Sequence, residues 1–275
     1  MSCSRHTVLL GDTFELLGKL DAGIARTCVT SPPYWDCRKY GSAVSLGDEH
    51  DPAVYVEEVV RALRPLRRIL ALDGHLWLNL GDVFAGSGHP RARGAFGGAV
   101  KDRDLVGLPW RVALALQVDG WFLRCDIVWQ KSDSAPDSAP HRPMRAHEYL
   151  FLLAPSAESF FDAAALEDCR RSVWTVATAA KPHSSKHPAR FPPGLVVPCI
   201  RATTRSGDLV LDPFNGAGTT GLVALAEDRR YLGIELESRW AEESRLALAL
   251  ACPACRSALR AGGTPEFAPS KLAPP

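Results

Sequence analysis

The sequence has no long hydrophobic run and no compact cysteine framework. No stretch approaches the roughly 18 apolar residues of a membrane span, and Asp12 and Glu15 interrupt the N-terminal region before a signal-peptide core is complete. The eight cysteines are scattered along the chain, which is typical of reduced thiols and not of a secreted disulfide scaffold. We therefore expect a soluble, cytoplasmic protein with no membrane partner.

The sequence also has no excess of positive or negative charge, because the formal net charge is only +1. The chain as a whole has no attraction for a polyanion, so any contact with nucleic acid must come from local clusters of Lys and Arg. A hydrophobic content of 46% and a charged content of 23% exclude a disordered chain. They allow a large core that needs neither disulfides nor metal.

One cysteine pair, Cys252 and Cys255, has the spacing of half a zinc knuckle. A structural zinc site needs four ligands, and the second pair is missing. A His or a distant Cys can complete the set, and two ordinary thiols are the alternative. We assign no metal to this sequence.

Short apolar runs bounded by turn residues predict buried strands, and they alternate with stretches of helical periodicity. This alternation predicts an α/β fold with a mostly parallel sheet covered on both faces. The predicted helices are 51–70, in which Pro65 introduces a bend, 105–118, 217–228 and 237–251. The runs RTCVTSPPY, GHLWLNLGD, GWFLRCDIVWQK, HEYLFLLA, DLVLDPFNG and RRYLGIELE are the predicted strands, whereas 85–104 and 132–146 are predicted loops.

A Gly-rich turn, DLVLDPFNGAGTTG at 208–221, follows one of these strands and begins a helix. Gly216 and Gly218 allow a ligand to approach the backbone closely, although a tight strand-to-helix turn is the simpler alternative. The next strand ends at Glu235, which can accept hydrogen bonds from both hydroxyls of a ribose. Thr219 and Thr220 follow the turn, and we expect at least one of them to cap the helix.

The segment TSPPYW at 30–35 follows the apolar strand IARTCV. Pro32 and Pro33 stop the strand and leave nearby carbonyls as acceptors. The Ser31 hydroxyl and the Pro32 carbonyl can accept the two N–H donors of an exocyclic amine. Tyr34 offers a flat face to a base flipped out of a duplex, and Trp35 adds a second apolar wall. A surface turn with a packed aromatic is the alternative.

Together, DPFNGAGTTG, GIELE and SPPY resemble the motifs of the DNA amino-methyltransferases, and the likeness extends over about residues 7–250. With the catalytic motif first and the Gly-rich motif last, the order resembles the permuted β group. The resemblance implies a Rossmann-like S-adenosylmethionine-dependent methyltransferase fold with a largely parallel sheet of seven strands. It also implies one catalytic domain over 1–262, with DNA-contacting loop insertions at about 85–104 and 132–186 and a disordered tail at 263–275.

The resemblance further implies which residues bind the cofactor, S-adenosyl-L-methionine. Asp12 is expected to bond the adenine amine, although a helix N-cap is its competing role. HPARFPPGLVVPCIRA at 187–202 is similar to the segment that closes over the methionine moiety, and the alternative is a helix start with Phe191 in the core. The predicted cofactor residues are Asp12, His187, Phe191, Asp212, Phe214, Asn215, Gly216, Gly218 and Glu235.

Within the family, Ser before Pro-Pro-aromatic resembles the cytosine-N4 branch, whereas Asp is commoner among adenine-N6 enzymes. The same resemblance places Asn79 and Asp82 beside the base pocket, and a polar cap on the following turn is the alternative. Asp36 is a weaker candidate for a catalytic residue. His147 and Glu148 look like an acid-base pair, but neighbours on a strand face opposite ways and we assign them no catalytic role. The predicted catalytic residues are Ser31, Pro32, Pro33, Tyr34, Asn79 and Asp82.

Contacts with DNA require phosphate clamps and base readers, and Arg-rich loops are the concentrated source of both. Any one of these charges can instead be a solvated surface residue. The predicted DNA-contacting residues are Trp35, Arg91, Arg93, Arg142, Arg170, Arg171 and Lys186.

The sequence thus predicts a methyltransferase that modifies the N4 amine of a flipped cytosine in double-stranded DNA. We expect a monomer or homodimer in a restriction-modification or regulatory setting, with a cognate restriction endonuclease as a partner. Adenine-N6 methylation, an RNA substrate and a non-catalytic DNA-binding regulator that keeps the cofactor pocket are the alternatives.

Overall fold

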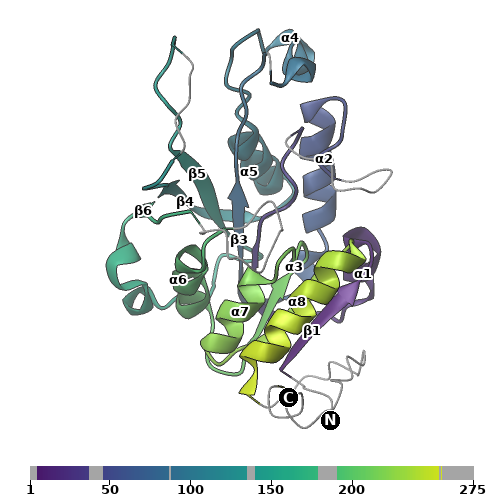
Figure 1. Cartoon of the computed structure of the whole chain (residues 1–275), viewed down its shortest axis with the longest axis vertical. Coiled ribbons are helices and arrows are strands. Elements are labelled where there is room, and N and C mark those ends of the chain that lie inside the picture. The colour runs from purple at the N-terminus through teal and green to yellow at the C-terminus, as the bar shows by residue number, and fades with distance from the viewer. Residues whose placement is uncertain are drawn as a thin grey trace.

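The computed structural model describes residues 5–36, 46–86, 88–134, 140–178, 191–253 and 255. Within these residues eight strands form one sheet in the order β1-β8-β7-β2-β3-β5-β4-β6 (Figure 1). Only β5 runs against its neighbours, β3 and β4, and every other neighbouring pair is parallel. The strands are β1 (His6–Leu10), β2 (Ala25–Thr30), β3 (Leu70–Leu80), β4 (Phe122–Gln130), β5 (His147–Ala154), β6 (Val173–Thr175), β7 (Leu209–Asp212) and β8 (Arg230–Glu235).

The predicted largely parallel sheet is confirmed, but it has eight strands where the sequence predicted seven. The additional strand is β6, which has three residues. Only Trp174 of these is buried, so β6 has no apolar run that sequence periodicity can detect.

The four predicted helical stretches are confirmed with boundaries shifted by a few residues, whereas three of the helices given below, α1, α4 and α6, were not predicted from periodicity. Pro65 does more than bend the predicted helix 51–70, because it separates two helices, α2 and α3. The α-helices are α1 (Thr13–Lys19), α2 (Pro52–Leu63), α3 (Leu66–Ile69), α4 (Ala95–Gly98), α5 (Leu108–Val118), α6 (Pro193–Thr203), α7 (Thr219–Ala226) and α8 (Ser238–Ala251), with 3₁₀ turns η1 (Pro90–Ala92) and η2 (Ala163–Arg170).

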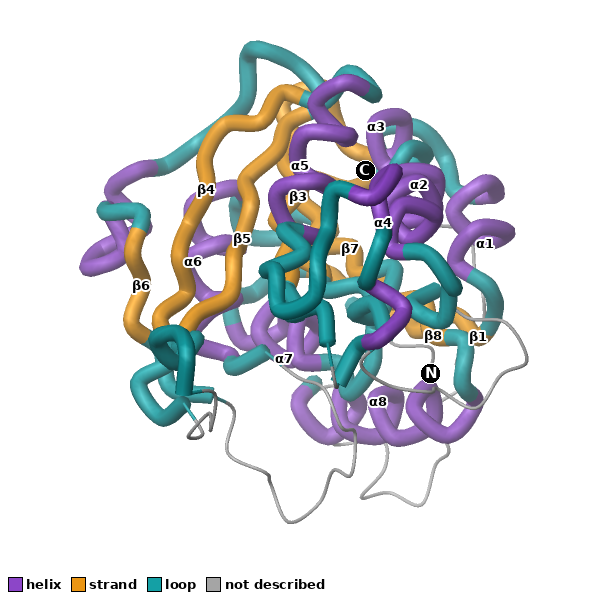
Figure 2. Tube along the Cα trace, turned by 90° about the horizontal axis from the view of Figure 1, so that it is seen from above, coloured by secondary structure: helices purple, strands orange, loops and turns teal. Residues whose placement is uncertain are grey.

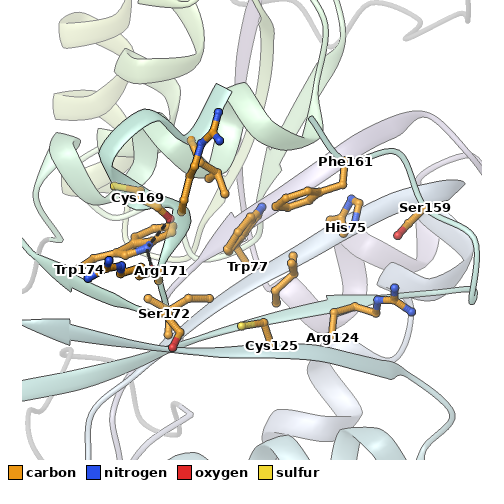
Figure 3. Close-up of a pocket in the computed structure, with 14 residues that line it drawn as sticks. His75, Trp77, Arg124, Cys125, Ser159, Phe161, Cys169, Arg171, Ser172 and Trp174 are labelled. Carbon is orange, nitrogen blue, oxygen red and sulfur yellow. Dashed lines mark hydrogen bonds between the residues drawn. The ribbon is translucent and has the colours of Figure 1, made fainter. Parts of the chain in front are cut away.

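Helices cover both faces of the sheet, as the tube view shows (Figure 2). On one face α6, α7 and α8 pack against a cluster that includes Trp77 of β3 and Leu150 and Leu152 of β5. This face also holds a pocket of about 350 Å³ between β3, β4, η2 and β6, with Trp77 and Phe161 in its wall (Figure 3).

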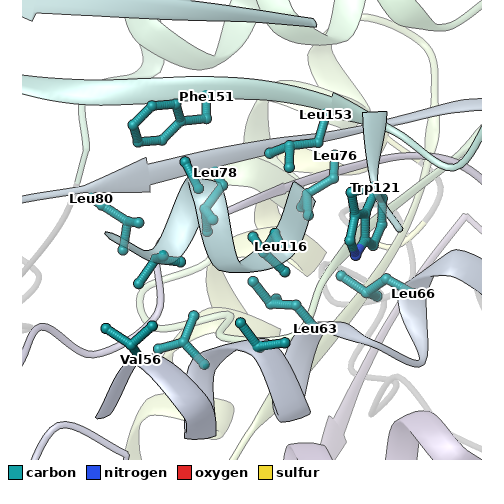
Figure 4. Close-up of a cluster of buried hydrophobic side chains, with 14 of the residues drawn as sticks. Val56, Leu63, Leu66, Leu76, Leu78, Leu80, Leu116, Trp121, Phe151 and Leu153 are labelled. Carbon is teal, nitrogen blue, oxygen red and sulfur yellow. The ribbon is translucent and has the colours of Figure 1, made fainter. Parts of the chain in front are cut away.

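On the other face, α2, α3 and α5 contribute to a second cluster (Figure 4). Leu76 and Leu78 of β3 and Phe151 and Leu153 of β5 belong to it, one residue out of step with the side chains of the first face. This period of two explains the unbroken apolar runs 76–78 of β3 and 150–153 of β5, because both sides of the sheet are buried there.

The predicted loops contain little regular structure. Within 85–104 there are only the short segments η1 and α4, and the described part of 132–146 contains neither helix nor strand. Residues 135–139 and the predicted tail 263–275 lie outside the described residues. No helix in the described part of the chain is long and apolar enough to cross a membrane.

Candidate active site

The carboxyl ends of the parallel strands meet at one edge of the sheet, which is where open α/β sheets bind ligands. A hydrogen bond of 2.9 Å from the Gly11 amide to the Glu235 carbonyl joins the end of β1 to the end of β8. The Thr30 hydroxyl lies 2.7 Å from a carboxylate oxygen of Asp212, which joins the ends of β2 and β7. The segments predicted to bind cofactor and target therefore share this edge.

The Gly-rich turn after β7 is tied to the strand beside it. Gly216 and Gly218 adopt φ values of +50° and +78°, in the left-handed region that favours glycine. The Gly216 amide donates a hydrogen bond of 2.7 Å to Glu235 Oε2, and the other carboxylate oxygen accepts from the Glu237 amide at 3.0 Å. Burial raises the pKa of Glu235.

Asp212 lies inside the protein, with 2% of its surface exposed. Its carboxylate accepts hydrogen bonds from the Thr30 and Thr220 hydroxyls and the Phe214 amide, at 2.7, 2.8 and 3.1 Å. Burial raises the pKa of Asp212 to about 6, against the lowering effect of these bonds. The carboxylate therefore holds β2, β7 and α7 together.

The expected cap on α7 is wrong. Gly218 occupies the N-cap position, and no side chain caps the helix there. Thr220 is fully buried, and its hydroxyl lies within hydrogen-bond distance of Asp212 and of the Val29 carbonyl. The left-handed turn thus leads directly into α7 and turns Thr220 toward the sheet.

Asn215 holds the turn from within. It is 4% exposed, accepts a hydrogen bond of 2.8 Å from the Tyr231 hydroxyl and donates one of 2.9 Å to Ser244 Oγ. Phe214, by contrast, is half-buried beside it. Of the predicted cofactor residues in this turn, Phe214 and Gly216 are the more accessible.

Asp12 is exposed just after β1, next to the end of β8. Its carboxylate accepts a hydrogen bond of 3.2 Å from the Glu15 amide and caps α1, which is the competing role weighed for it. Phe191 is half-buried against the cluster of α6, α7 and α8, and α6 begins two residues later. His187 lies outside the described residues.

Tyr34 is the central residue of the predicted target-binding part of this edge. Its hydroxyl lies 2.7 Å from Glu148 Oε2, 3.0 Å from Asn79 Oδ1 and 3.3 Å from Ser31 Oγ. The ring lies against Gly81, where a Cβ would come within 2.6 Å of the ring. Two strand ends, β2 and β3, thus set the position of this aromatic face.

The residues next to Tyr34 are held by the core. The Pro33 carbonyl accepts a hydrogen bond of 2.9 Å from Tyr55 of α2, and Pro32 is buried. Trp35 is only 1% exposed and donates from its ring nitrogen to the Glu49 carbonyl at 2.8 Å. Its ring therefore lies in the core, in contrast with the expected exposed wall.

Asn79 lies near the end of β3 and Asp82 follows the strand, and the two have different surroundings. Asn79 donates to the Tyr149 carbonyl at 3.0 Å and presents its oxygen to Tyr34. Asp82 accepts from the amides of Val83, Gly107 and Leu108 at about 3.0 Å each, which supplies the cap that the start of α5 lacks. This is the polar-cap alternative for Asp82, and Asn79 is the residue of the two that reaches the site.

Glu148 is the site residue that sequence reasoning passed over. It belongs to β5, contacts Tyr34 and forms an ion pair with Lys131. The alternation rule for a strand holds, but the sequence does not say that β5 lies beside β3 and brings Glu148 to Tyr34. A carboxylate at the start of an otherwise apolar run was the available signal.

A family model described as DNA methylase (N6_N4_Mtase) matches residues 25–245. The chain belongs to this DNA methylase family. The match includes SPPY, the Gly-rich turn and Glu235, the segments that the fold brings to one edge.

Two curated relatives of this DNA methylase match most of its length. Type II methyltransferase M.Cfr9I of Citrobacter freundii is 41% identical over 257 residues, which cover 86% of this chain and 85% of the relative. Type II methyltransferase M.XycI of Xanthomonas campestris pv. cyanopsidis is 43% identical over 255 residues, which cover 85% and 84%.

Solved structures share the fold of the methylase. PvuII DNA methyltransferase (cytosine-N4-specific) superposes with a TM-score of 0.72 at 23% identity, covering 89% of this chain and 86% of that one. A DNA modification methylase from Thermus thermophilus, complexed with S-adenosyl-L-methionine, superposes with a TM-score of 0.66 at 26% identity and covers 90% and 95%.

The predicted DNA-contacting arginines of the methylase occupy different places. Arg91 forms an ion pair with Asp36, directly after TSPPYW, and donates to the Glu49 carbonyl at 3.2 Å. Arg93 pairs with Asp102 at 2.6 Å, and both side chains are about half exposed. Arg91 thus contacts the segment after Tyr34, whereas Arg93 is held within its own loop.

The other predicted arginines are spread more widely. Arg142 stacks over the Phe84 ring, with its guanidinium carbon 3.6 Å from the ring centroid. Arg170 and Arg171 are exposed and line the pocket between β3, β4, η2 and β6. No residue that lines this pocket belongs to the Gly-rich turn or to TSPPYW. The structure does not bring these two together with Arg91. Lys186 lies outside the described residues.

Proposed function

We propose that the chain transfers a methyl group from S-adenosyl-L-methionine to the exocyclic N4 amine of a flipped cytosine in double-stranded DNA. The observation that carries this proposal is the 2.7 Å hydrogen bond between Thr30 and Asp212. Thr30 directly precedes Ser31 of the target segment, and Asp212 begins the Gly-rich turn. Methyl donor and target amine then bind side by side, as a direct displacement requires.

The residues around the Gly-rich turn fit S-adenosylmethionine. Asp12 and Glu235 offer carboxylates at the ends of neighbouring strands, which suit an adenine amine and a ribose diol. Phe214, in the turn itself, adds a half-buried apolar surface. When bound, the cofactor supplies an electrophilic methyl group. The Thermus thermophilus structure, which contains this cofactor on the same fold, supports the assignment.

The residues around Tyr34 fit a flipped base. The Ser31 hydroxyl and the Pro32 carbonyl accept the N–H donors of the target amine, which directs the nitrogen lone pair at the methyl group. Tyr34 stacks on the base, while Asn79, whose amide oxygen lies 3.0 Å from the Tyr34 hydroxyl, helps to position the ring. Cytosine is favoured over adenine because Ser31 stands where the adenine-N6 branch more often has Asp.

The test uses the full chain with labelled S-adenosylmethionine and unmodified genomic DNA. The product is digested to nucleosides, and the methylated nucleoside is identified by mass spectrometry. We expect N4-methyl-2′-deoxycytidine from DNA and no methylation of RNA. N6-methyl-2′-deoxyadenosine as the sole product would overturn the cytosine assignment, and tight cofactor binding without methyl transfer to any DNA would favour the regulator.

We further propose that the enzyme protects DNA from a cognate restriction endonuclease. The curated relatives are type II methyltransferases, which supports this role. DNA isolated from cells that express the chain should resist a nuclease of the same recognition sequence, and methylation-sensitive sequencing of that DNA identifies the sequence. Uniform cleavage of the modified sites would contradict this role.

A further inference from the structure

Three side chains of the kinds that bind metals meet at the opposite end of β1 from the candidate active site, which lies at the carboxyl-end edge of the sheet and is called the active edge below. The ligand atoms of His6, Cys252 and Cys255 all lie within 4.8 Å of one another. The three residues are 4%, 1% and 4% exposed. Two thiols and an imidazole from opposite ends of the sequence therefore share one buried position.

The fold holds these residues in place from both sides. His6 is the first residue of β1 and pairs with Tyr231 of β8. Cys252 is the C-cap of α8, with its amide 2.9 Å from the Leu248 carbonyl. Helix α8 is fixed to β1 by the Arg245 guanidinium, which donates to the Val8 carbonyl at 2.7 and 3.1 Å.

We propose that His6, Cys252 and Cys255 bind a zinc ion. Thiolate sulfur and imidazole nitrogen are the ligands that zinc prefers in structural sites, and Cys-x-x-Cys is a common spacing for a ligand pair. Tetrahedral bonds of about 2.0–2.3 Å place such ligand atoms about 3.5–3.8 Å apart. The observed limit of 4.8 Å requires these atoms to approach by at most about 1.3 Å, which side-chain rotations supply.

Burial also supports a metal over simple packing. A small apolar cluster of Ala249, Cys252 and Cys255 accounts for two buried thiols. It does not account for the His6 imidazole, whose ring nitrogen lies within 4.8 Å of both sulfur atoms.

Structural zinc sites have four ligands, and the described residues supply three of them. Cys3 stands three positions before His6 in the sequence, the same spacing that separates Cys252 from Cys255. Cys3 lies outside the described residues, and the proposal does not depend on it.

The site is structural and not catalytic. His6 begins β1, whereas Asp12 and the active edge follow the other end of this strand, about 13 Å away for four steps of about 3.3 Å. The ion would clamp the first strand to the last helix, and so fix the strand that carries Asp12 against β8.

The test measures zinc in the full chain, produced without a histidine tag in medium with added zinc. We expect about one zinc per chain by elemental mass spectrometry, and a several-fold loss in Cys252→Ser and in Cys255→Ser. Cys125→Ser is the matched control, since Cys125 is a partly buried cysteine of β4 outside this cluster, and it should retain its zinc. A strong chelator should lower the melting temperature of the wild type and of Cys125→Ser, and should have little effect on the two metal-site variants.

Cobalt gives a readout that does not depend on whether the variants fold. Stripped wild-type protein titrated with Co²⁺ should show sulfur-to-cobalt charge-transfer absorption and the visible bands of tetrahedral coordination. Wild-type protein with less than about 0.2 zinc per chain and no such cobalt spectrum would overturn the proposal. Zinc contents unchanged in both Cys252→Ser and Cys255→Ser would overturn it as well.

Discussion

The hydroxyl of Tyr34 lies 2.7 Å from the carboxylate of Glu148, 114 positions later in the chain. Burial, and then the charge of Glu148, raises the pKa of Tyr34 well above its usual value, so this hydroxyl stays protonated and donates. Lys131 forms an ion pair with the same carboxylate. The Tyr34 ring, which is offered to a flipped base, is therefore held at its hydroxyl by the ion pair of Glu148 in β5 and Lys131, the residue after β4.

Tyr34→Ala should weaken DNA binding and leave the cofactor site intact. Loss of the stacking face costs about 1–3 kcal/mol, or roughly 5-fold to 150-fold in affinity for a DNA substrate. The affinity for S-adenosylmethionine, measured by calorimetry, should be nearly unchanged. Tyr34→Phe keeps the face and loses only the hydroxyl contacts to Glu148, Asn79 and Ser31, so it should bind DNA better than Tyr34→Ala. Equal losses of DNA and cofactor affinity in Tyr34→Ala would show that Tyr34 is structural.

Gly81→Ala should displace the Tyr34 ring without changing any of the predicted catalytic side chains. A Cβ at Gly81 would come within 2.6 Å of Tyr34 Cε2, so the ring must move. We expect methyl transfer to fall about tenfold or more, equivalent to about 1.4 kcal/mol in the barrier. Gly18→Ala is the matched control, because Gly18 lies in α1 with open space around its Cβ position. Activities of the two variants within a factor of two would contradict the role given to this contact.

Glu235→Ala should loosen the Gly-rich turn and weaken cofactor binding. The carboxylate accepts hydrogen bonds from the Gly216 and Glu237 amides and is also the predicted partner of the ribose. Hydrogen bonds to charged groups contribute about 1.5–3 kcal/mol, so the dissociation constant of S-adenosylmethionine should rise at least tenfold. Glu242→Ala, an exposed change on α8, should leave it unchanged. Comparable binding by both variants would remove Glu235 from the cofactor site.

Asp212 predicts how stability depends on pH. Its pKa is about 6 in the folded protein, above the ordinary value of 3.8, so the native state binds this proton more tightly than the unfolded state does. Its contribution to stability is therefore largest below pH 3.8, falls as the pH rises toward 6 and is constant above that, by about 3 kcal/mol in all.

The variant Asp212→Asn does not titrate and isolates this effect. Relative to wild type, the free energy of unfolding of Asp212→Asn should rise between pH 4 and pH 7, measured by urea denaturation. Its absolute stability will also include a constant loss from the altered bonds to Thr30 and Thr220. A difference between the two proteins that does not change with pH would contradict the raised pKa.

Local features of the structure were predictable because the residues that cause them are adjacent in sequence. Pro65 marks the break between α2 and α3, since a proline cannot continue the backbone hydrogen bonding of a helix. The positive φ values of Gly216 and Gly218 follow from a turn that must reverse sharply between strand and helix. Thr220 shows the limit of this reasoning, because its buried bond to Asp212 prevailed over a local capping preference.

Six of the strands, most helices, the family and the two motifs at Ser31–Tyr34 and Asp212–Gly218 could be read from the sequence, because each depends on a short stretch of chain. Which distant groups meet depends on the tertiary fold. It placed β5 beside β3, which brought Glu148 to Tyr34, and it directed Asp82 to the start of α5. It also packed α8 on β1, which placed His6 against Cys252 and Cys255. The physical reason is that strand order and helix packing follow from burial summed over the whole sheet, and a local pattern does not contain that sum.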